Sequence, residues 1–156
     1  MRPFVEMLDA LSAERAEFLM VGGYALATYG APRATGDFDI WVRPSPENAR
    51  RVYSALVRFG APLRAHGVEV ADFELADVVY QIGVPPQRID IVTSISGVDF
   101  ESAWLGRMQT TFLGRPVDVM SREDYIKNKR ASGRPKDLLD VLAIEAVMRA
   151  EHAPEE

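Results

Sequence analysis

Apolar residues along this chain repeat with two periods, and together these predict a mixed α/β domain. Spacings of three and four residues, which place side chains on one face of a helix, are typical of the helical segments. Short β-rich apolar runs bounded by glycine or proline indicate strands. The predicted helices span residues 3–16, 24–29, 46–59, 99–104, 121–133 and 136–149, and the predicted strands span residues 18–21, 38–42, 78–82, 88–92, 109–112 and 117–119. We expect an α/β (α+β) fold with a small mixed sheet of about five strands and helices packed mainly on one face.

Local signals mark where several of these elements begin and end. Ser45 followed by Pro46 is typical of a helix N-cap with proline at the first helical position. Residues 83–87 and 113–116 predict the turns of two hairpins. Residues 60–77 contain glycine and proline without a clear period, so we expect loop and irregular turns there.

Composition places the chain among ordinary globular proteins. Its 156 residues are 47% hydrophobic and 26% charged, which suits a single domain over residues 1–150 with a frayed tail at 151–156. There is no cysteine, so disulfides and thiolate ligands are excluded and a reducing, cytoplasmic location is expected. With His66 and His152 as the only histidines, a histidine-built zinc site is disfavoured.

Net charge and hydropathy narrow the range of partners. The formal net charge is -5 at pH 7, which disfavours a protein that coats nucleic acid over its whole surface and requires a local basic patch for any polyanion. No apolar run approaches the length of a membrane span, and the N-terminal residues do not follow a signal-peptide pattern. We therefore expect no association with a membrane.

Three aspartates in two predicted strands are the candidate chemistry. Asp37 and Asp39 stand in the run Asp-Phe-Asp-Ile, and Asp90 stands in Arg-Ile-Asp-Ile-Val. Because side chains alternate along a strand, Asp37 and Asp39 share one face while their apolar neighbours point to the core, and Asp90 has the same pattern. On adjacent strands, about 4.8 Å apart, three such acids can surround one small volume.

Three uncompensated carboxylates at that spacing repel one another strongly. Mg²⁺ relieves the repulsion, because it prefers oxygen ligands and is held by a few carboxylates together with substrate phosphates. Two ions about 3.5–4 Å apart can clamp the attacking and leaving oxygens of a phosphoryl displacement. The alternative is that Asp37 and Asp39 are merely solvated residues on an exposed strand face, although aspartate is disfavoured in strands.

A glycine turn in front of the acids strengthens the functional interpretation. Gly22 and Gly23 follow the predicted buried strand at 18–21 and precede a short helix. The first amides of such a helix have no partner within it and can bind phosphate. A Gly-Gly pair alone is weakly diagnostic, because any turn from strand to helix can use it.

Together these motifs resemble the nucleotidyltransferase superfamily with the polymerase-beta-type fold. The shared features are an apolar residue followed by Gly-Gly, the Asp-x-Asp strand and a later strand aspartate. Further segments are similar to a bacterial group of small stand-alone members, which relate to the nucleotidyltransferase toxins of abortive-infection-type toxin–antitoxin pairs. These segments are residues 23–26, 29–35, 88–91 and 128–137, and the resemblance covers roughly residues 18–145.

The resemblance implies an enzyme that moves a nucleoside monophosphate from a nucleoside triphosphate to a hydroxyl acceptor and releases pyrophosphate. It implies that Gly22 and Gly23 form the phosphate turn, that Asp37 and Asp39 bind Mg²⁺, and that Asp90 is the third carboxylate. Asp90 would help to deprotonate the acceptor, directly or as a metal ligand. Many members have serine where this chain has Gly23, and longer members append an acceptor-binding domain that this chain lacks. We therefore expect a second subunit, identical or different, to supply that surface.

A basic segment stands out in this acidic chain. A solvated helix face explains such a cluster without any function, yet a triphosphate needs cations beyond magnesium. Lys129 is the first candidate for a triphosphate contact, followed by Arg134 and Lys136 at the start of the last helix. Arg33 and Thr35, in the loop before the acids, are near enough to reach a phosphate. The cations of the segment are Arg122, Lys127, Lys129, Arg130, Arg134 and Lys136.

Two other residues have both a functional and a structural interpretation. Trp41 shares the predicted face of the acids, so it can stack on a base or simply pack in the core. Asp137 belongs to the segment shared with the toxin-like group, but an acid at a helix N-terminus is explained by the helix dipole alone.

The sequence therefore predicts Mg²⁺-dependent nucleotidyl transfer from a nucleoside triphosphate such as ATP. The acceptor can be an RNA end such as that of tRNA, a hydroxyl of a partner protein in a toxin–antitoxin pair, or a small antibiotic. The rival interpretation is a non-catalytic module of the same fold that binds a nucleotide or a partner. The presence of all three acids argues against that rival.

Overall fold

The computed structural model of the protein describes residues 1–32 and 35–153. Within these residues the chain forms helices and strands close to the predicted ones, and both predicted hairpins are present. The elements are α1 (Arg2–Ala13), β1 (Phe18–Val21), the 3₁₀ helix η1 (Gly23–Ala27), β2 (Asp37–Val42), α2 (Pro46–Phe59), the 3₁₀ helix η2 (Val70–Glu74), β3 (Val79–Ile82), β4 (Arg88–Val92), α3 (Phe100–Leu105), β5 (Met108–Phe112), β6 (Arg115–Val119), α4 (Arg122–Ser132) and α5 (Pro135–Glu151).

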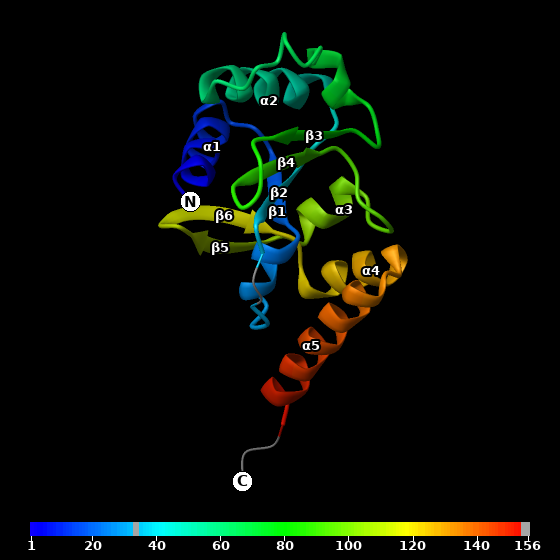
Figure 1. Ribbon diagram of the computed structural model, residues 1–156. Helices are drawn as coiled ribbons and strands as arrows, with labels where there is room; N and C mark the ends of the chain where they lie inside the picture. The colour runs from blue at the N-terminus through cyan, green and yellow to red at the C-terminus, as the bar shows by residue number, and fades with distance from the viewer. Residues whose placement is uncertain (33–34, 154–156) are drawn as a thin grey trace.

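A mixed sheet forms the centre of the molecule, in the order β3-β4-β2-β1-β6-β5 (Figure 1). The pairs β2–β4 and β1–β6 are parallel, and the other neighbours are antiparallel. The described residues therefore contribute six strands, and the expected number of about five was wrong. The hairpin β5–β6 joins the same sheet because Met20 of β1 pairs with Val119 of β6.

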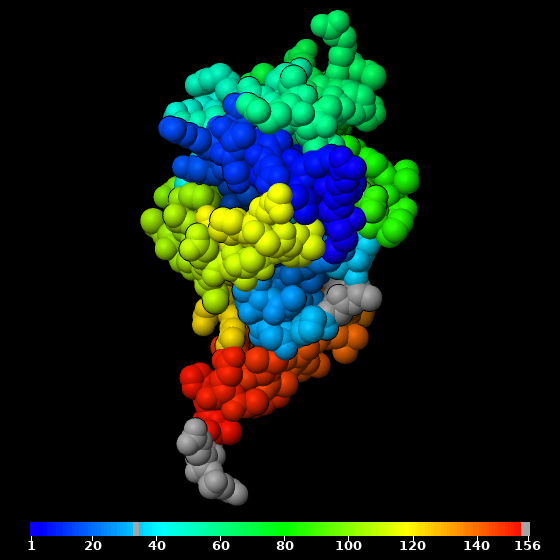
Figure 2. All heavy atoms as spheres, turned by 90° about the vertical axis from the view of Figure 1, so that its left-hand side faces the viewer, coloured from blue at the N-terminus to red at the C-terminus, as the bar shows by residue number. Residues whose placement is uncertain are grey.

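Helices lie on both faces of the sheet. On one face, Phe4 of α1 packs against Phe38 of β2 with ring centroids 4.8 Å apart, and α2 packs on α1. On the other face, Trp41 of β2 meets Phe100 of α3 at 5.0 Å. The expectation that helices pack mainly on one face thus agrees with α1 and α2, but α3 lies on the other face. Figure 2 shows α1 beside the β5–β6 hairpin at the surface.

The helices α4 and α5 form a hairpin in which α4 lies next to the sheet and α5 extends away from it (Figures 1 and 2). Ser121 caps α4 through its side chain, and Gly133 ends it with φ 69°, a left-handed conformation that glycine adopts without strain. Pro135 then begins α5. The inner side of α5 buries Val141 and Ile144, while Leu139 on its outer side is 65% exposed. No helix in the described ranges is long and apolar enough to cross a membrane.

Candidate functional site

The three predicted acids meet on one face of the sheet. β2 and β4 are adjacent and parallel, and their register places Asp39 directly opposite Asp90 and Asp37 opposite Arg88. Residues that alternate on paired strands share a face, so the carboxylates of Asp37, Asp39 and Asp90 lie together. Asp90 is 8% exposed. The structure therefore brings together the acids that strand alternation had placed on one side, and their role in binding metal stays a prediction.

Asp39 is surrounded by groups that disfavour its negative charge. Burial raises its pKa to about 6, and the negative charges of Asp90 and Asp37 and a hydrogen bond with Asp90 act in the same direction. The positive charge of Lys129 lowers the pKa in part. The raised pKa indicates that the negative charge of the cluster is only partly compensated by the cations nearby.

The glycine turn packs directly against Asp39. Gly22 has φ 71° and ψ -155°, a backbone conformation almost confined to glycine. A Cβ at this position would overlap Oδ2 of Asp39. A Cβ at Gly23 would lie 2.8 Å from Cβ of Thr35, which is also too close. Both glycines therefore allow the loop and the acid strand to approach the turn. That the turn binds phosphate stays a prediction.

Arg88 is the residue of this site that the sequence interpretation missed. Its Nε donates to Oδ1 of Asp90 at 3.0 Å, and its Nη2 donates to Oδ2 of Asp37 at 3.0 Å and to Oδ2 of Asp90 at 3.3 Å. The signal that could have revealed it is the alternation in β4, because Arg88 stands two residues before Asp90 and so shares its face. Its pairing with Asp37 depends on the strand register, which the sequence does not state.

Lys129 on α4 forms a buried ion pair with Asp137 on α5. The two residues are 8% and 0% exposed, and Nζ of Lys129 lies 3.4 Å from Oδ1 of Asp137. Asp137 also accepts hydrogen bonds from Ser132 Oγ at 2.5 Å and Arg134 Nε at 2.7 Å. Burial by itself raises the pKa of Asp137, but these hydrogen bonds and the nearby positive charges outweigh it and lower the pKa to about 2. Asp137 thus holds Lys129 in place. These contacts are a structural role for Asp137 in addition to its favourable position at the N-terminus of α5.

The helix α4 connects this ion pair to the glycine turn. The hydroxyl of Tyr125 donates to the carbonyl oxygen of Gly22 at 3.5 Å. The ammonium of Lys129 lies 5.2 Å from the centre of the Tyr125 ring, within the range of a cation–π contact. Since Lys129 also influences the pKa of Asp39, the turn, the acid strands and α4 form one electrostatic unit.

The other predicted residues lie at different distances from this unit. Lys136 is exposed on α5, and the side chain of Arg134 is 61% exposed where it reaches Asp137. Arg33 lies outside the described residues. Trp41 is 1% exposed and packs on α3, so it is a core residue and cannot stack on a base.

Two further cations of the basic segment are engaged in ion pairs. Arg122 pairs with Glu151, and Arg130 pairs with Glu145 at 2.9 Å. Both pairs join α4 to α5, so these arginines help to hold the helical hairpin together. Lys127 remains exposed. The basic segment therefore serves largely in contacts between α4 and α5. Lys129 is the member of the segment whose charge acts on the pKa of Asp39.

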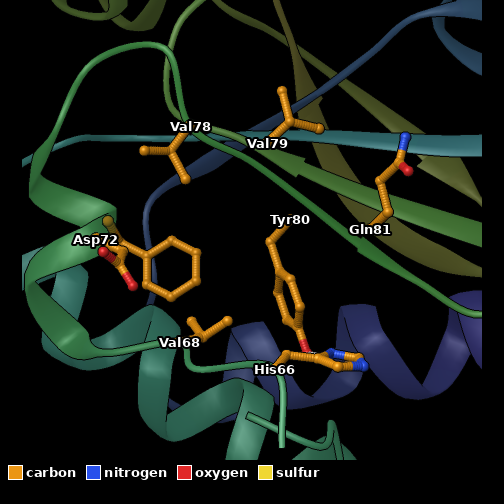
Figure 3. Close-up of a pocket in the computed structure, with 8 residues that line it drawn as sticks. His66, Val68, Asp72, Val78, Val79, Tyr80 and Gln81 are labelled. Carbon is orange, nitrogen blue, oxygen red and sulfur yellow. Dashed lines mark hydrogen bonds between the residues drawn. The ribbon is translucent and has the colours of Figure 1, made fainter.

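A separate hollow of about 420 Å³ lies beside β3. Figure 3 shows Val78 and Tyr80 directed into it, with His66 at its rim, while Val79 and Gln81 point away. Nδ1 of His66 lies 2.9 Å from the hydroxyl of Tyr80. Because Gln81 is the residue that pairs with Asp90, the hollow opens on the opposite face from the acids and is not part of their site.

The donor set of the acid cluster suits a hard divalent cation. Three carboxylates supply oxygen ligands of the kind that Mg²⁺ prefers. Because Gly22 has no side chain, it does not cover Oδ2 of Asp39. Among residues 1–32 and 35–153, however, no three acidic or histidine side chains stand as a set that could hold a metal ion. Arg88 donates hydrogen bonds to Asp37 and Asp90, so part of this oxygen set already has a partner within the protein.

Comparison with known proteins does not assign the site. No protein-family model matches this chain, and no curated protein matches it. The function is therefore inferred from the geometry described above and from the resemblance of the motifs.

Proposed function

We propose that this protein is a Mg²⁺-dependent nucleotidyltransferase that moves a nucleoside monophosphate from a nucleoside triphosphate to a hydroxyl acceptor. The observation that carries the proposal is the register of β2 and β4, which sets Asp39 against Asp90 beside a glycine turn whose backbone touches Asp39. The raised pKa of Asp39 supports it, because perturbed carboxylates cluster at functional sites.

In this proposal Asp37, Asp39 and Asp90 hold the metal. Magnesium, when bound, neutralises the charge of the carboxylates and of the triphosphate and orients the reacting phosphate. Asp90 is the carboxylate proposed to accept the proton of the acceptor hydroxyl or to orient it. Catalysis of this kind depends on positioning and charge, so the protein needs no covalent nucleophile.

Lys129 is the proposed cation for the triphosphate. It is the cation of the basic segment that acts on the pKa of Asp39, and Asp137 fixes its position from behind. Arg134 and Lys136 lie beyond this pair on the surface, where they can meet the distal end of a triphosphate or the acceptor. Thr35, which packs on Gly23, and Gly22 and Gly23 themselves are the proposed phosphate contacts of the turn.

One observation favours a second candidate, a non-catalytic module of the same fold that binds a partner or a nucleotide. Arg88 pairs with both Asp37 and Asp90, so two of the three carboxylates have a cation of the protein's own. In such a module these ion pairs would be permanent and would serve only the fold.

The test is a transfer assay with α-³²P-labelled nucleoside triphosphates and Mg²⁺. Separate reactions contain total RNA, the protein encoded by the neighbouring gene, or a panel of aminoglycosides, so that the labelled product identifies the acceptor class. We expect label on one acceptor class with the wild type, and none with Asp39→Asn or in EDTA. Unlabelled acceptors in every reaction, or equal labelling by Asp39→Asn, would reject the proposal.

A further inference from the structure

Arg88 bridges two of the three carboxylates of the acid cluster. It lies on β4, two residues before Asp90 and directly across from Asp37, which puts all three side chains on one face. Its guanidinium makes three hydrogen bonds of 3.0–3.3 Å to Asp37 and Asp90. The bridge therefore follows from strand register and alternation, and not from an isolated surface contact.

This bridge uses the oxygens that a divalent ion would need. Both oxygens of Asp90 and Oδ2 of Asp37 accept hydrogen bonds from Arg88. Mg²⁺ binds carboxylate oxygens directly and tolerates little departure from its preferred geometry. An ion and the guanidinium therefore compete for the same oxygens, and one must withdraw for the other to bind.

Arg88 is the partner that can withdraw. Its side chain is 28% exposed, and it follows the exposed turn at residues 83–87, so rotation of its own torsions can carry the guanidinium outward. Of the two acids that it binds, Asp90 is 8% exposed and has less freedom. The side chain of Asp37 is 37% exposed, but it is too short to carry its carboxylate far from the strand. Arginine keeps its charge at all relevant pH values, and its planar fork fits phosphate as well as carboxylate.

We propose that Arg88 is an exchangeable counter-ion of this site. Without a divalent ion it bridges Asp37 and Asp90; it gives up both carboxylates when an ion binds, and its guanidinium then pairs with a phosphate of the triphosphate. The phosphate contact rests on the proposed function, whereas the exchange of Arg88 for an ion does not. The consequence is coupling: a bound ion frees Arg88 for the triphosphate, so each ligand favours the other.

The exchange is tested with Mn²⁺ alone, followed by electron paramagnetic resonance at neutral pH. Arg88→Gln removes the competitor, so it should bind Mn²⁺ about five- to tenfold more tightly than the wild type, within the range usual for coupled sites. Arg88→Lys keeps the charge but cannot bridge two carboxylates with a fork, so its affinity should lie between the two. The matched control is Arg115→Gln, which breaks an exposed pair with Asp9 elsewhere on the molecule and should bind Mn²⁺ as the wild type does.

A metal-free measurement tests the counter-ion role on its own. In EDTA, Arg88→Gln leaves Asp37 and Asp90 without their bridge beside Asp39, so it should unfold at a lower temperature than Arg115→Gln. Added Mn²⁺ should raise the unfolding temperature of Arg88→Gln more than that of the wild type. Equal unfolding temperatures of the two variants in EDTA would reject the counter-ion role.

The phosphate contact is tested with a non-hydrolysable nucleoside triphosphate at saturating Mg²⁺. Arg88→Gln should bind it about tenfold more weakly than the wild type, opposite in sign to its effect on Mn²⁺. Mn²⁺ affinity of Arg88→Gln equal to or below that of the wild type would overturn the exchange. Tighter Mn²⁺ binding with unchanged triphosphate affinity would overturn the phosphate contact. A wild type that binds Mn²⁺ but no triphosphate would reject the proposed function while the exchange stands.

Discussion

Two carboxylates of this protein, Asp39 on β2 and Asp137 on α5, sit in opposite electrostatic surroundings. Asp39 is partly buried among other acids, and its pKa is raised to about 6. Asp137 is fully buried, receives hydrogen bonds from Ser132 and Arg134, faces Lys129, and its pKa is lowered to about 2. The difference separates a carboxylate whose surroundings disfavour its negative charge from one whose surroundings stabilise it.

The contrast explains why the two clusters are assigned different roles. An acid surrounded by hydrogen-bond donors and cations stabilises the fold and has little left to offer a ligand. An acid surrounded by acids is kept by the protein at a cost to stability, which a bound divalent ion can offset. The Asp137 cluster is therefore the anchor of the α4–α5 hairpin, and the Asp39 cluster is the candidate reaction centre.

The largest expected effect comes from Asp137→Asn. This change leaves Lys129 buried without its counter-charge, so we expect a loss of about 4 kcal/mol in the free energy of unfolding. Urea unfolding followed by circular dichroism measures it. Asp9→Asn, at the exposed pair with Arg115, is the control and should change stability by less than about 1 kcal/mol. Equal stability of the two variants would remove the distinction between the clusters.

The next largest effect is expected from Gly22→Ala. Its Cβ would overlap Asp39 and its backbone would occupy a conformation nearly forbidden to alanine, so we expect a loss of about 3 kcal/mol. Gly60→Ala is the matched control, because Gly60 has φ 93° but open space around its Cβ position, and it should cost about 1 kcal/mol. If both substitutions cost the same, the turn does not press against the acid strand.

The smallest of these effects is a change in pH dependence. Because the pKa of Asp39 is higher in the folded state than its ordinary value of 3.8, its protonation favours folding below about pH 4, and this contribution is lost as the pH rises through about 6. An asparagine at this position does not titrate. The free energy of unfolding of Asp39→Asn, relative to that of the wild type, should therefore rise by about 2 kcal/mol from pH 4 to pH 7 in EDTA.

The Asp137 cluster should respond to pH with the opposite sign. Its folded-state pKa is depressed to about 2, so its contribution is present above about pH 4 and is lost as the pH falls through about 2. Unfolding curves of both variants between pH 2 and pH 8 measure the two windows. A stability difference between Asp39→Asn and the wild type that stays constant from pH 4 to pH 7 would contradict the raised pKa.

Much of the fold could be predicted from the sequence, because its signals are local. Alternation in residues 37–40 separated acids from apolar residues, and Ser45, Asp99 and Ser121 cap the helices that follow them. The sheet was harder, since pairing is not local. The sixth strand belongs to the sheet through the pairing of β1 with β6, which no pattern within either strand encodes.

Of the candidate site, the acids and Lys129 could be named from the sequence, but Arg88 and the contacts of both cations could not. Asp37, Asp39 and Asp90 follow from alternation and from adjacency of two strands. The contacts of Arg88 depend on the register of β2 against β4, and the burial of Lys129 depends on how α5 folds back on α4. Both contacts depend on tertiary structure, so the sequence alone does not show which acid each cation contacts.

The central claim is that Asp37, Asp39 and Asp90 form one metal-dependent triphosphate site. Isothermal titration of a non-hydrolysable nucleoside triphosphate into the wild type and Asp39→Asn, each with Mg²⁺ and with EDTA, tests it most directly. We predict binding by the wild type with Mg²⁺, and a loss of at least about tenfold in affinity both in EDTA and in Asp39→Asn. Equal affinity in all four titrations, or no binding by the wild type with Mg²⁺, would contradict the claim.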